Sequence, residues 1–241
     1  MSNIAIIFAG GTGSRMGAGL PKQFLKINGK SILIHTLENF QNSIYIDKIY
    51  IACKLEYLDK TKYEIEKFQI TKVKAIVPGG KTGQDSIYNA LSKAAEENPK
   101  NSIVLIHDGV RPCISDEVIK KNIESVKENG SAITSTSCYE TVILSENGKE
   151  IESIPSRDIA YTAQAPQSFY LNDILQAHNI IRKINPLYEG IVDSCSLYKK
   201  LNKKVFMIKG NRGNIKVTTP EDFYILRALL EYKESKQILG L

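Results

Sequence analysis

The sequence opens with IAIIFAGGTGSRMG at residues 4–17, and PKQ follows at residues 21–23. The first five of these letters are apolar, as in a short buried strand. The strand leads into four glycines within eight residues, so backbone N–H groups can approach a polyphosphate without obstruction by a Cβ atom. Arg15 and Lys22 bring positive charge to the same place. We therefore predict a triphosphate-binding loop made by Ala9, Gly10, Gly11, Thr12 and Gly13.

Two widespread nucleotide loops do not fit this stretch. A dinucleotide-binding fingerprint requires G-x-G-x-x-G, but Met16 occupies the position of its last glycine. Walker A fails as well, because the first glycine of G-x-x-x-x-G-K-[ST] would fall on Phe24 or on Ala75. The loop therefore belongs to another class of nucleotide site.

Length and composition favour one α/β domain spanning residues 1–241, with 42% hydrophobic residues to form its core. The net charge of +6 is spread along the chain without a long basic run, which suits phosphate substrates better than nucleic acid. The four cysteines form no C-x-x-C pair and are expected to be reduced thiols. No apolar run approaches the ~18 residues of a membrane span, so we expect a cytoplasmic protein without membrane contact.

Short apolar runs alternate with helical patterns along the first half of the chain. The expected strands are 4–8, 48–52, 73–77, 102–107 and 132–136, and the expected helices between them are 32–40, 55–68, 85–97 and 116–128. This alternation predicts a Rossmann-like α/β fold, with a mainly parallel sheet flanked by helices. Further helices are expected at 171–183 and 193–201, a strand at 204–208, and a last helix after Thr219.

Polar clusters follow three of the expected strands. The glycine loop follows the first strand, PGGK at 78–81 follows the third, and HDGVRP at 107–112 follows the fourth. Ligands bind outside the carboxyl ends of such strands, so the three clusters should converge on one crevice. Asp108 is the candidate ligand of a Mg²⁺ ion, because a carboxylate at this position can hold a metal that bridges phosphate oxygens, or else a substrate hydroxyl.

The strand and helix alternation breaks between residues 138 and 154. Two strand-like pieces flank Asn147-Gly148, which is a strong signal for a β-hairpin turn. An isolated hairpin is only marginally stable in water, so this arm, approximately residues 138–156, is expected to pack on a second subunit.

Five ordered elements of the sequence resemble the family of methylerythritol-phosphate and ribitol-phosphate cytidylyltransferases. They are GGTGSRM with PKQ, GGKTGQDS at 79–86, HDGVRP at 107–112, the group ETV, PSR and AQAPQSF between 140 and 169, and NIKVTTPED at 214–222. The departure is Gly83, where the family usually has arginine or another polar residue. This change puts one contact of the pyrimidine loop in question.

The resemblance implies transfer of CMP from CTP to a polyol phosphate in a homodimer whose arm reaches into the partner's active site. It implies that Gly79, Gly80 and Ser86 help to bind the nucleotide and that Arg15, Lys22 and Lys216 are catalytic. The residues that it implies for the acceptor are Asp108, Arg111, Thr141, Arg157 and Lys216.

Two details of the resemblance point to the ribitol-5-phosphate branch. The arm reads ETVI at 140–143 where the methylerythritol branch usually has D-T-[VI]-K, and Val110 stands where that branch typically has alanine. The alternative acceptor is 2-C-methyl-D-erythritol 4-phosphate. A non-catalytic nucleotide-binding or nucleic-acid-binding protein is the alternative of another class, because it would use the glycine loop without any acceptor site.

Overall fold

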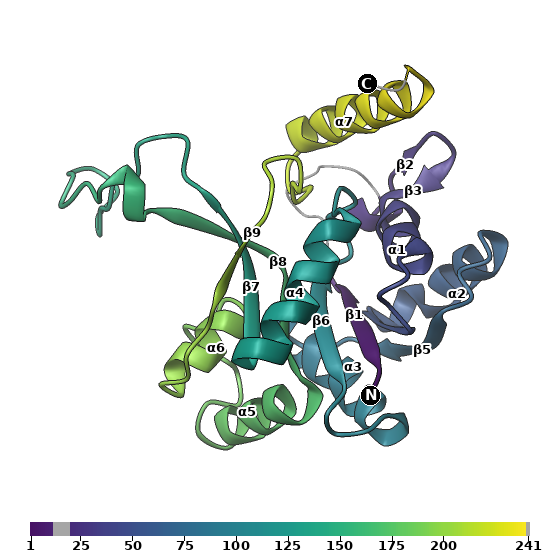
Figure 1. Ribbon diagram of the computed structural model, residues 1–241, viewed down its shortest axis with the longest axis horizontal. Coiled ribbons are helices and arrows are strands. Elements are labelled where there is room, and N and C mark those ends of the chain that lie inside the picture. The colour runs from purple at the N-terminus through teal and green to yellow at the C-terminus, as the bar shows by residue number, and fades with distance from the viewer. Residues whose placement is uncertain (12–19, 240–241) are drawn as a thin grey trace.

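The central element is a mostly parallel sheet with helices on both faces (Figure 1). A computed structural model describes residues 1–11 and 20–239, with side chains as far as residue 235. The strand order is β5-β4-β1-β6-β8-β7-β9, and the predicted α/β fold is confirmed. The strands of this sheet are β1 (Asn3–Ala9), β4 (Lys48–Cys53), β5 (Val73–Pro78), β6 (Ile103–Asp108), β7 (Ser131–Ser137), β8 (Tyr161–Tyr170) and β9 (Met207–Lys209).

The helices alternate with these strands in the order expected from the sequence. They are α1 (Ile32–Asn42), α2 (Leu58–Lys67), α3 (Gly83–Glu97), α4 (Asp116–Asn129), α5 (Leu171–Ile184), α6 (Ser194–Lys200) and α7 (Pro220–Leu239). Short 3-10 turns are η2 (Lys22–Phe24), η3 (Leu55–Tyr57) and η4 (Arg157–Ile159), and β2 (Lys26–Ile27) pairs with β3 (Lys30–Ser31) outside the main sheet. None of the helices in the described ranges is both long and apolar enough to cross a membrane.

Alternate residues of each buried strand feed two hydrophobic cores. Ala5 and Ile7 of β1 pack with α1, α2 and α4 on one face, whereas Ile4 and Ile6 pack with α3, α5 and α6 on the other. Because nearly all side chains of β1, β4 and β6 are buried, these strands read as continuous apolar runs. The polar ends of β1 and β6 are thereby left to form a site at the carboxyl edge of the sheet.

Strand β8 was not predicted as a strand, and it lies inside the sheet. It runs antiparallel to both β6 and β7, with the register Val104↔Phe169 and Ala132↔Ser168. Pro166 cannot donate a ladder hydrogen bond and is normally excluded from such a position. The β7–β8 register shifts next to it, and the Thr134 hydroxyl donates to the Pro166 carbonyl across 2.8 Å. The bulge therefore accommodates a proline that hides this strand in the sequence.

The arm protrudes from the ends of β7 and β8 (Figure 1). The expectation of two strand-like pieces in it is wrong, since pairing within residues 138–156 is limited to one bridge, Leu144↔Ser153. The turn does form at the expected Asn147-Gly148, where the Asn147 side chain accepts from the N–H groups of Lys149 and Glu150. Among the residues that the structure describes, no layer covers the exposed arm, so a regular ladder has no buried apolar face to stabilise it.

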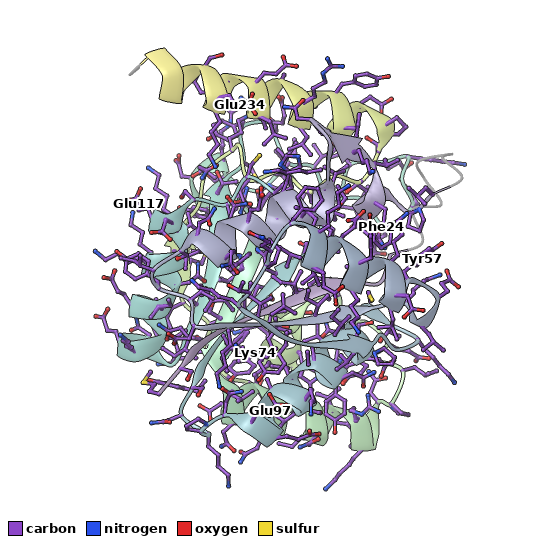
Figure 2. All side chains as sticks on the ribbon, turned by 90° about the vertical axis from the view of Figure 1, so that its right-hand side faces the viewer. Phe24, Tyr57, Lys74, Glu97, Glu117 and Glu234 are labelled. Carbon is purple, nitrogen blue, oxygen red and sulfur yellow. The ribbon has the colours of Figure 1, made fainter. Side chains whose placement is uncertain are left out.

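Helix α7 crosses one end of the molecule in the turned view of Figure 2. Its Leu226 and Leu230 pack with Ile32 and with Val217, which immediately follows Lys216 in the chain. The Asp222 carboxylate accepts from the backbone N–H groups of Thr218 and Thr219 and so fixes the start of the helix. Helix α7 therefore anchors the segment that carries Lys216.

Candidate active site

The two predicted nucleotide loops meet at Ser86. Its hydroxyl accepts from the Gly80 N–H at 3.0 Å and donates to the Thr82 carbonyl at 3.0 Å. A Cβ atom on Gly10 would lie 3.4 Å from the Ser86 hydroxyl, so the loop after β1 touches the loop after β5. A Cβ atom on Gly80 would lie 2.1 Å from that of Asp85, which excludes any side chain at this position.

Lys22 is held at the end of β1 by its neighbours. The Gln23 side chain donates to the Ala9 carbonyl across 2.8 Å, and the Phe24 ring packs against Tyr57 with the ring centres 5.2 Å apart (Figure 2). A Cβ atom on Gly11 would lie 3.7 Å from Cε of Lys22, so the lysine stem lies beside the predicted phosphate loop. Thr12, Gly13 and Arg15, which belong to the same predictions, lie outside the described residues.

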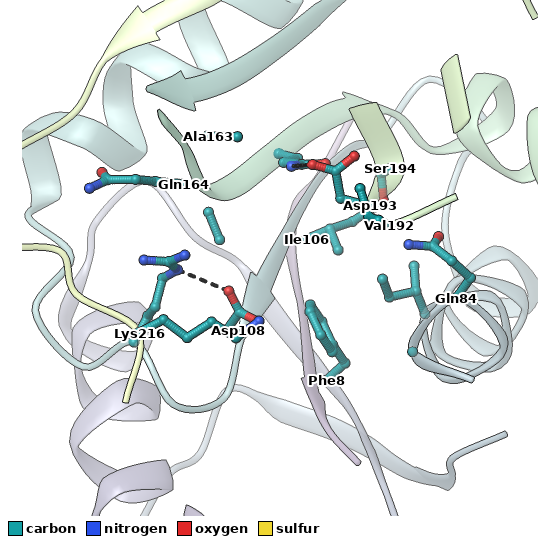
Figure 3. A pocket seen from close by; sticks show the side chains of 15 residues that line it. Phe8, Gln84, Ile106, Asp108, Ala163, Gln164, Val192, Asp193, Ser194 and Lys216 are labelled. Carbon is teal, nitrogen blue, oxygen red and sulfur yellow. Dashed lines mark hydrogen bonds and ion pairs between the residues drawn. The ribbon is translucent and has the colours of Figure 1, made fainter. Parts of the chain in front are cut away.

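Asp108 lies between two cations at the end of β6. Its Oδ1 is 2.6 Å from Nζ of Lys216 (Figure 3 labels both residues), and its Oδ2 accepts from Nε of Arg111 at 2.9 Å. Burial alone would raise the pKa of the Asp108 carboxyl, but the two cations outweigh burial and hold that pKa below its ordinary value. The carboxylate is therefore ionised and fixes the Lys216 ammonium.

Arg111 joins this cluster to the last loop of the site. Its guanidinium also donates to the Asn214 carbonyl at 2.7 Å, and the Val217 N–H donates to the Val110 carbonyl at 3.0 Å. Asn214 is fully buried and donates to the Ala165 carbonyl of β8 at 2.7 Å. These bonds place Lys216 against β6 although more than 100 residues separate them in the sequence.

Two cavities adjoin the Asp108–Lys216 pair. Both are lined by Phe8, Asp108 and Lys216. The first, of about 210 Å³, is lined by Ala9, Gly10, Gly11, Lys22, Gln23 and Val110 in addition to the shared residues. The second, of about 250 Å³, extends toward α3, β8 and α6 (Figure 3). We call them the phosphate cavity and the inner cavity.

Predicted site residues line both cavities. The described residues of the predicted loop after β1 line the phosphate cavity, whereas Asp108, Arg111 and Lys216, predicted to serve the acceptor, line the inner cavity. The predictions thus give the site a nucleotide side and an acceptor side, and the two cavities share Asp108 and Lys216.

Thr141 and Arg157 are not brought to either cavity of their own chain. Both are exposed on the arm, where the Arg157 guanidinium donates to the Thr141 hydroxyl at 3.2 Å. The two residues that the sequence predicts to act together therefore do lie together, but away from Asp108 and Lys216.

His107 is closed off from acid or base chemistry by burial, since its Nδ1 has no hydrogen-bond partner in the described part of the chain but is not exposed. It is fully buried, donates from Nε2 to the Arg111 carbonyl at 3.0 Å, and packs edge-on against Phe40. Burial lowers the pKa of His107 to about 4, so the imidazole is neutral at physiological pH. It supports the turn that carries Asp108 and Arg111.

No predicted site residue lies on the far wall of the inner cavity, although Gln84 belongs to the GGKTGQDS element. This wall consists of Gln84 on α3, Val192, and Asp193 and Ser194 at the start of α6. Nothing in the sequence around Asp193 marks a site, since its carboxylate reads as an ordinary N-cap, and it does accept from the Ser196 N–H at 2.7 Å.

Comparison with known proteins gives one consistent result. The profile of the family described as "IspD: 2-C-methyl-D-erythritol 4-phosphate cytidylyltransferase" matches residues 3–232. The chain is similar to a ribitol-5-phosphate cytidylyltransferase of Streptococcus agalactiae serotype V, with 45% identity over 100% of both chains. A protein of the same name from Vibrio parahaemolyticus is 46% identical over 99% of this chain and 100% of the relative.

More distant relatives are named for methylerythritol compounds and not for ribitol 5-phosphate. A 2-C-methyl-D-erythritol 4-phosphate cytidylyltransferase of Clostridium botulinum is 36% identical over 95% of this chain and 97% of the relative. Among solved structures, the 4-diphosphocytidyl-2C-methyl-D-erythritol synthase of Anaerococcus prevotii superposes with a TM-score of 0.80 at 29% identity, covering 95% of this chain and 96% of the other.

Proposed function

The chain belongs to the 2-C-methyl-D-erythritol 4-phosphate cytidylyltransferase family, and we propose that it acts as a ribitol-5-phosphate cytidylyltransferase within it. The reaction joins CTP and D-ribitol 5-phosphate to give CDP-ribitol and pyrophosphate. The observation that carries the proposal is the fixed Asp108–Lys216 pair, which separates a glycine-lined phosphate cavity from a second cavity of comparable size. Nucleotidyl transfer needs this arrangement, because two phosphorylated substrates must meet at one phosphorus atom.

The choice of ribitol rests on the relatives. Those named for ribitol 5-phosphate reach 45–46% identity over almost the whole chain, against 36% for those named for methylerythritol 4-phosphate. The ETVI arm element and Val110 point the same way.

The chemistry requires positioning and charge neutralisation more than proton transfer. An oxygen of the acceptor phosphate attacks the α-phosphorus of CTP, and the bond from that phosphorus to the bridging oxygen breaks to release pyrophosphate. The attacking phosphate is already anionic, which agrees with the neutral, buried His107. Lys22 is suited to neutralise the leaving pyrophosphate, with Arg15, and Lys216 is suited to steady the incoming phosphate.

We further propose that Mg²⁺ assists by neutralising phosphate charge, with Asp108 as its protein ligand. The described residues contain no group of three or more His, Cys, Asp or Glu side chains placed to hold a metal. A site held by one carboxylate and mainly by substrate phosphates is the usual arrangement for Mg²⁺. Each Asp108 oxygen accepts one bond and keeps a lone pair, so this residue fits that role.

The active unit in this proposal is a homodimer in a reducing, cytoplasmic compartment. The arm and its base expose seven large apolar side chains, Tyr139, Ile143, Leu144, Ile151, Ile154, Ile159 and Tyr161. So many exposed large apolar side chains within residues 139–161 are typical of an interaction site. A second copy of the chain would cover it and receive Arg157 and Thr141 at its acceptor side. All four cysteines are unpaired, which supports the reducing compartment.

A panel of pyrophosphate-release assays tests the function. Four nucleoside triphosphates are crossed with ribitol 5-phosphate, methylerythritol 4-phosphate and glycerol 3-phosphate, with Mg²⁺ and with excess chelator. We expect turnover with CTP, ribitol 5-phosphate and Mg²⁺ together. A preference for methylerythritol 4-phosphate would show that this compound, and not ribitol 5-phosphate, is the acceptor. Full activity in excess chelator would refute the proposed role of Mg²⁺. If no acceptor caused pyrophosphate release, the chain would be a nucleotide-binding protein without this activity.

A further inference from the structure

Two residues on the far wall of the inner cavity each carry a buried side-chain oxygen that has no hydrogen-bond partner among the described residues. Gln84 is 4% exposed and Ser194 is 1% exposed, and both line this cavity. Neither Oε1 of Gln84 nor Oγ of Ser194 finds a partner in the described part of the chain. Buried oxygen atoms without partners are uncommon because each loses its bonds to water, so this pair calls for a ligand or an ordered water.

The other polar side chains along the same wall are already bonded. Gln167 donates to Asp193 at 2.7 Å and accepts from the Cys195 N–H at 2.8 Å. Gln164 donates to the Asn211 carbonyl at 3.0 Å and accepts from Asn214 at 3.3 Å. These bonds make the wall rigid, and the hydrogen-bonding capacity toward the cavity is left to Gln84 and Ser194.

The cavity lies on the acceptor side of the reaction centre. Its lining contains Asp108, Arg111 and Lys216 but none of Ala9, Gly10, Gly11, Gly79, Gly80 and Ser86, the described residues predicted to bind the nucleotide; of the 79–86 element it contains Gly83 and Gln84. Figure 3 shows Lys216 and Asp108 on one side and Ser194 and Gln84 on the other, with Phe8 and Ile106 between them. A molecule whose phosphate lies near Lys216 would extend its other end toward Gln84 and Ser194.

We propose that Ser194 and Gln84 are specificity residues that bind the hydroxyl end of a straight polyol phosphate, and this rests on the proposed function. A hydroxyl both donates and accepts, which matches the Ser194 hydroxyl and the Gln84 carbonyl oxygen. Ribitol 5-phosphate has one more backbone carbon and one more hydroxyl than methylerythritol 4-phosphate. The extra terminal hydroxyl reaches the two oxygens that a shorter, methyl-branched chain leaves unpaired.

The test combines a change in the protein with a change in the substrate, as in a double-mutant cycle. The kcat/KM of wild type, Ser194→Ala and Gln84→Met is measured with ribitol 5-phosphate and with 1-deoxyribitol 5-phosphate, which lacks the terminal hydroxyl. Wild type should prefer the full polyol by about 3- to 10-fold or more, and each variant should narrow this preference by about 3- to 10-fold. Because Gln84→Met keeps the bulk of the side chain, it tests the oxygen and not the volume.

Ser92→Ala is the matched control, since the Ser92 hydroxyl on α3 also lacks a partner in the described part of the chain but does not line the cavity. It should leave the preference unchanged. Unchanged preference in folded Ser194→Ala and Gln84→Met would overturn the inference and assign the cavity to water. A raised KM for CTP with unchanged acceptor preference would also overturn it, in favour of the nucleotide. Wild type that fails to use ribitol 5-phosphate at all would instead show that the proposed function itself is wrong.

Discussion

Two charged groups predicted to serve the acceptor are held in opposite ways. Asp108, Lys216 and Arg111 form a cluster whose carboxylate is 8% exposed and bonded on both oxygens. Arg157 and Thr141 share one 3.2 Å hydrogen bond on an exposed arm without regular strands. The first group is preorganised by its own chain, so it is ready to stabilise developing charge. The second acquires a fixed environment only if another molecule covers the arm.

The largest loss of activity should follow the replacement of Lys22, which lines the phosphate cavity beside the Asp108–Lys216 pair. Lys22→Ala is expected to lower kcat by roughly 10²-fold or more, because it removes a fixed positive charge from the phosphate cavity. Arg15→Ala should have a similar effect. The thermal midpoint should change little in either variant.

Lys26→Ala is the control for this experiment, since Lys26 is exposed and lies four residues beyond Lys22. It should retain wild-type kcat. Activity of Lys22→Ala within threefold of wild type would remove Lys22 from the catalytic group.

Replacing the central carboxylate should disturb both activity and folding. Asp108→Asn leaves Lys216 and Arg111 without their counter-charge, so we expect kcat/KM to fall by roughly tenfold or more and stability to drop by about 3 kcal/mol. Steady-state kinetics at saturating Mg²⁺ and urea unfolding measure the two effects.

Glu124→Gln provides the surface counterpart, because Glu124 pairs with Lys120 at 3.7 Å on the exposed face of α4. Its loss should cost less than about 1 kcal/mol. Equal losses of stability in the two variants would refute the difference between the buried and exposed pairs.

The arm can be tested by mixing two inactive chains. Arg157→Ala should lower kcat/KM with ribitol 5-phosphate by roughly tenfold or more, through loss of a charged hydrogen bond to phosphate. If the arm completes the partner's site, a heterodimer with Lys22→Ala carries both defects in one site and leaves the other site intact. An equal mixture should then recover about a quarter of wild-type activity after subunit exchange.

Two Lys22→Ala preparations mixed in the same way serve as the control and should recover nothing. Size-exclusion chromatography with light scattering checks that the chain is dimeric and that exchange has occurred. Exchange without recovery above the parent proteins would show that each arm serves its own chain, or neither.

The contrast between the buried cluster and the exposed arm also explains which features the sequence could predict. Strands β1, β4 and β6 are buried on both faces, so their apolar runs predicted the parallel sheet. The polar residues that follow the strands predicted that Gly10, Ser86 and Asp108 lie at one edge of it. Strand β8 was missed because Pro166 and two glutamines interrupt its pattern, and only the bulge against β7 shows how it fits. The arm was predicted as a hairpin from Asn147-Gly148, but a turn signal does not supply the apolar cover that a ladder needs.

The inner cavity marks another limit of sequence reasoning. Gln84 of α3 and Ser194 of α6 line the same cavity although they are 110 residues apart in the sequence. A sequence pattern records which face of an element is apolar, but it does not record which polar atom ends up without a partner. The five matching motifs therefore contain Asp108, Arg111 and Lys216 of this cavity, but of its far wall they contain only Gln84 and not Val192, Asp193 or Ser194.

The smallest expected effect concerns pH and the turn beneath Asp108. Burial lowers the pKa of His107 to about 4, whereas an unfolded histidine titrates near its ordinary value of about 6.5. Between these values the unfolded chain binds a proton that the folded chain does not, so the free energy of unfolding should fall as the pH is lowered from about 6.5 toward 4. The expected slope is up to about 1.4 kcal/mol per pH unit, with no contribution from this group above pH 6.5.

Urea unfolding at pH 7, 6 and 5 measures this slope, and His107→Gln should lose less stability than wild type as the pH falls. His178, whose pKa is lowered by burial to about 3, contributes a similar slope in both proteins and so cancels in the comparison. Equal slopes for wild type and His107→Gln would show that the Asp108 turn tolerates a protonated histidine, and the buried cluster would then be less rigid than its hydrogen bonds indicate.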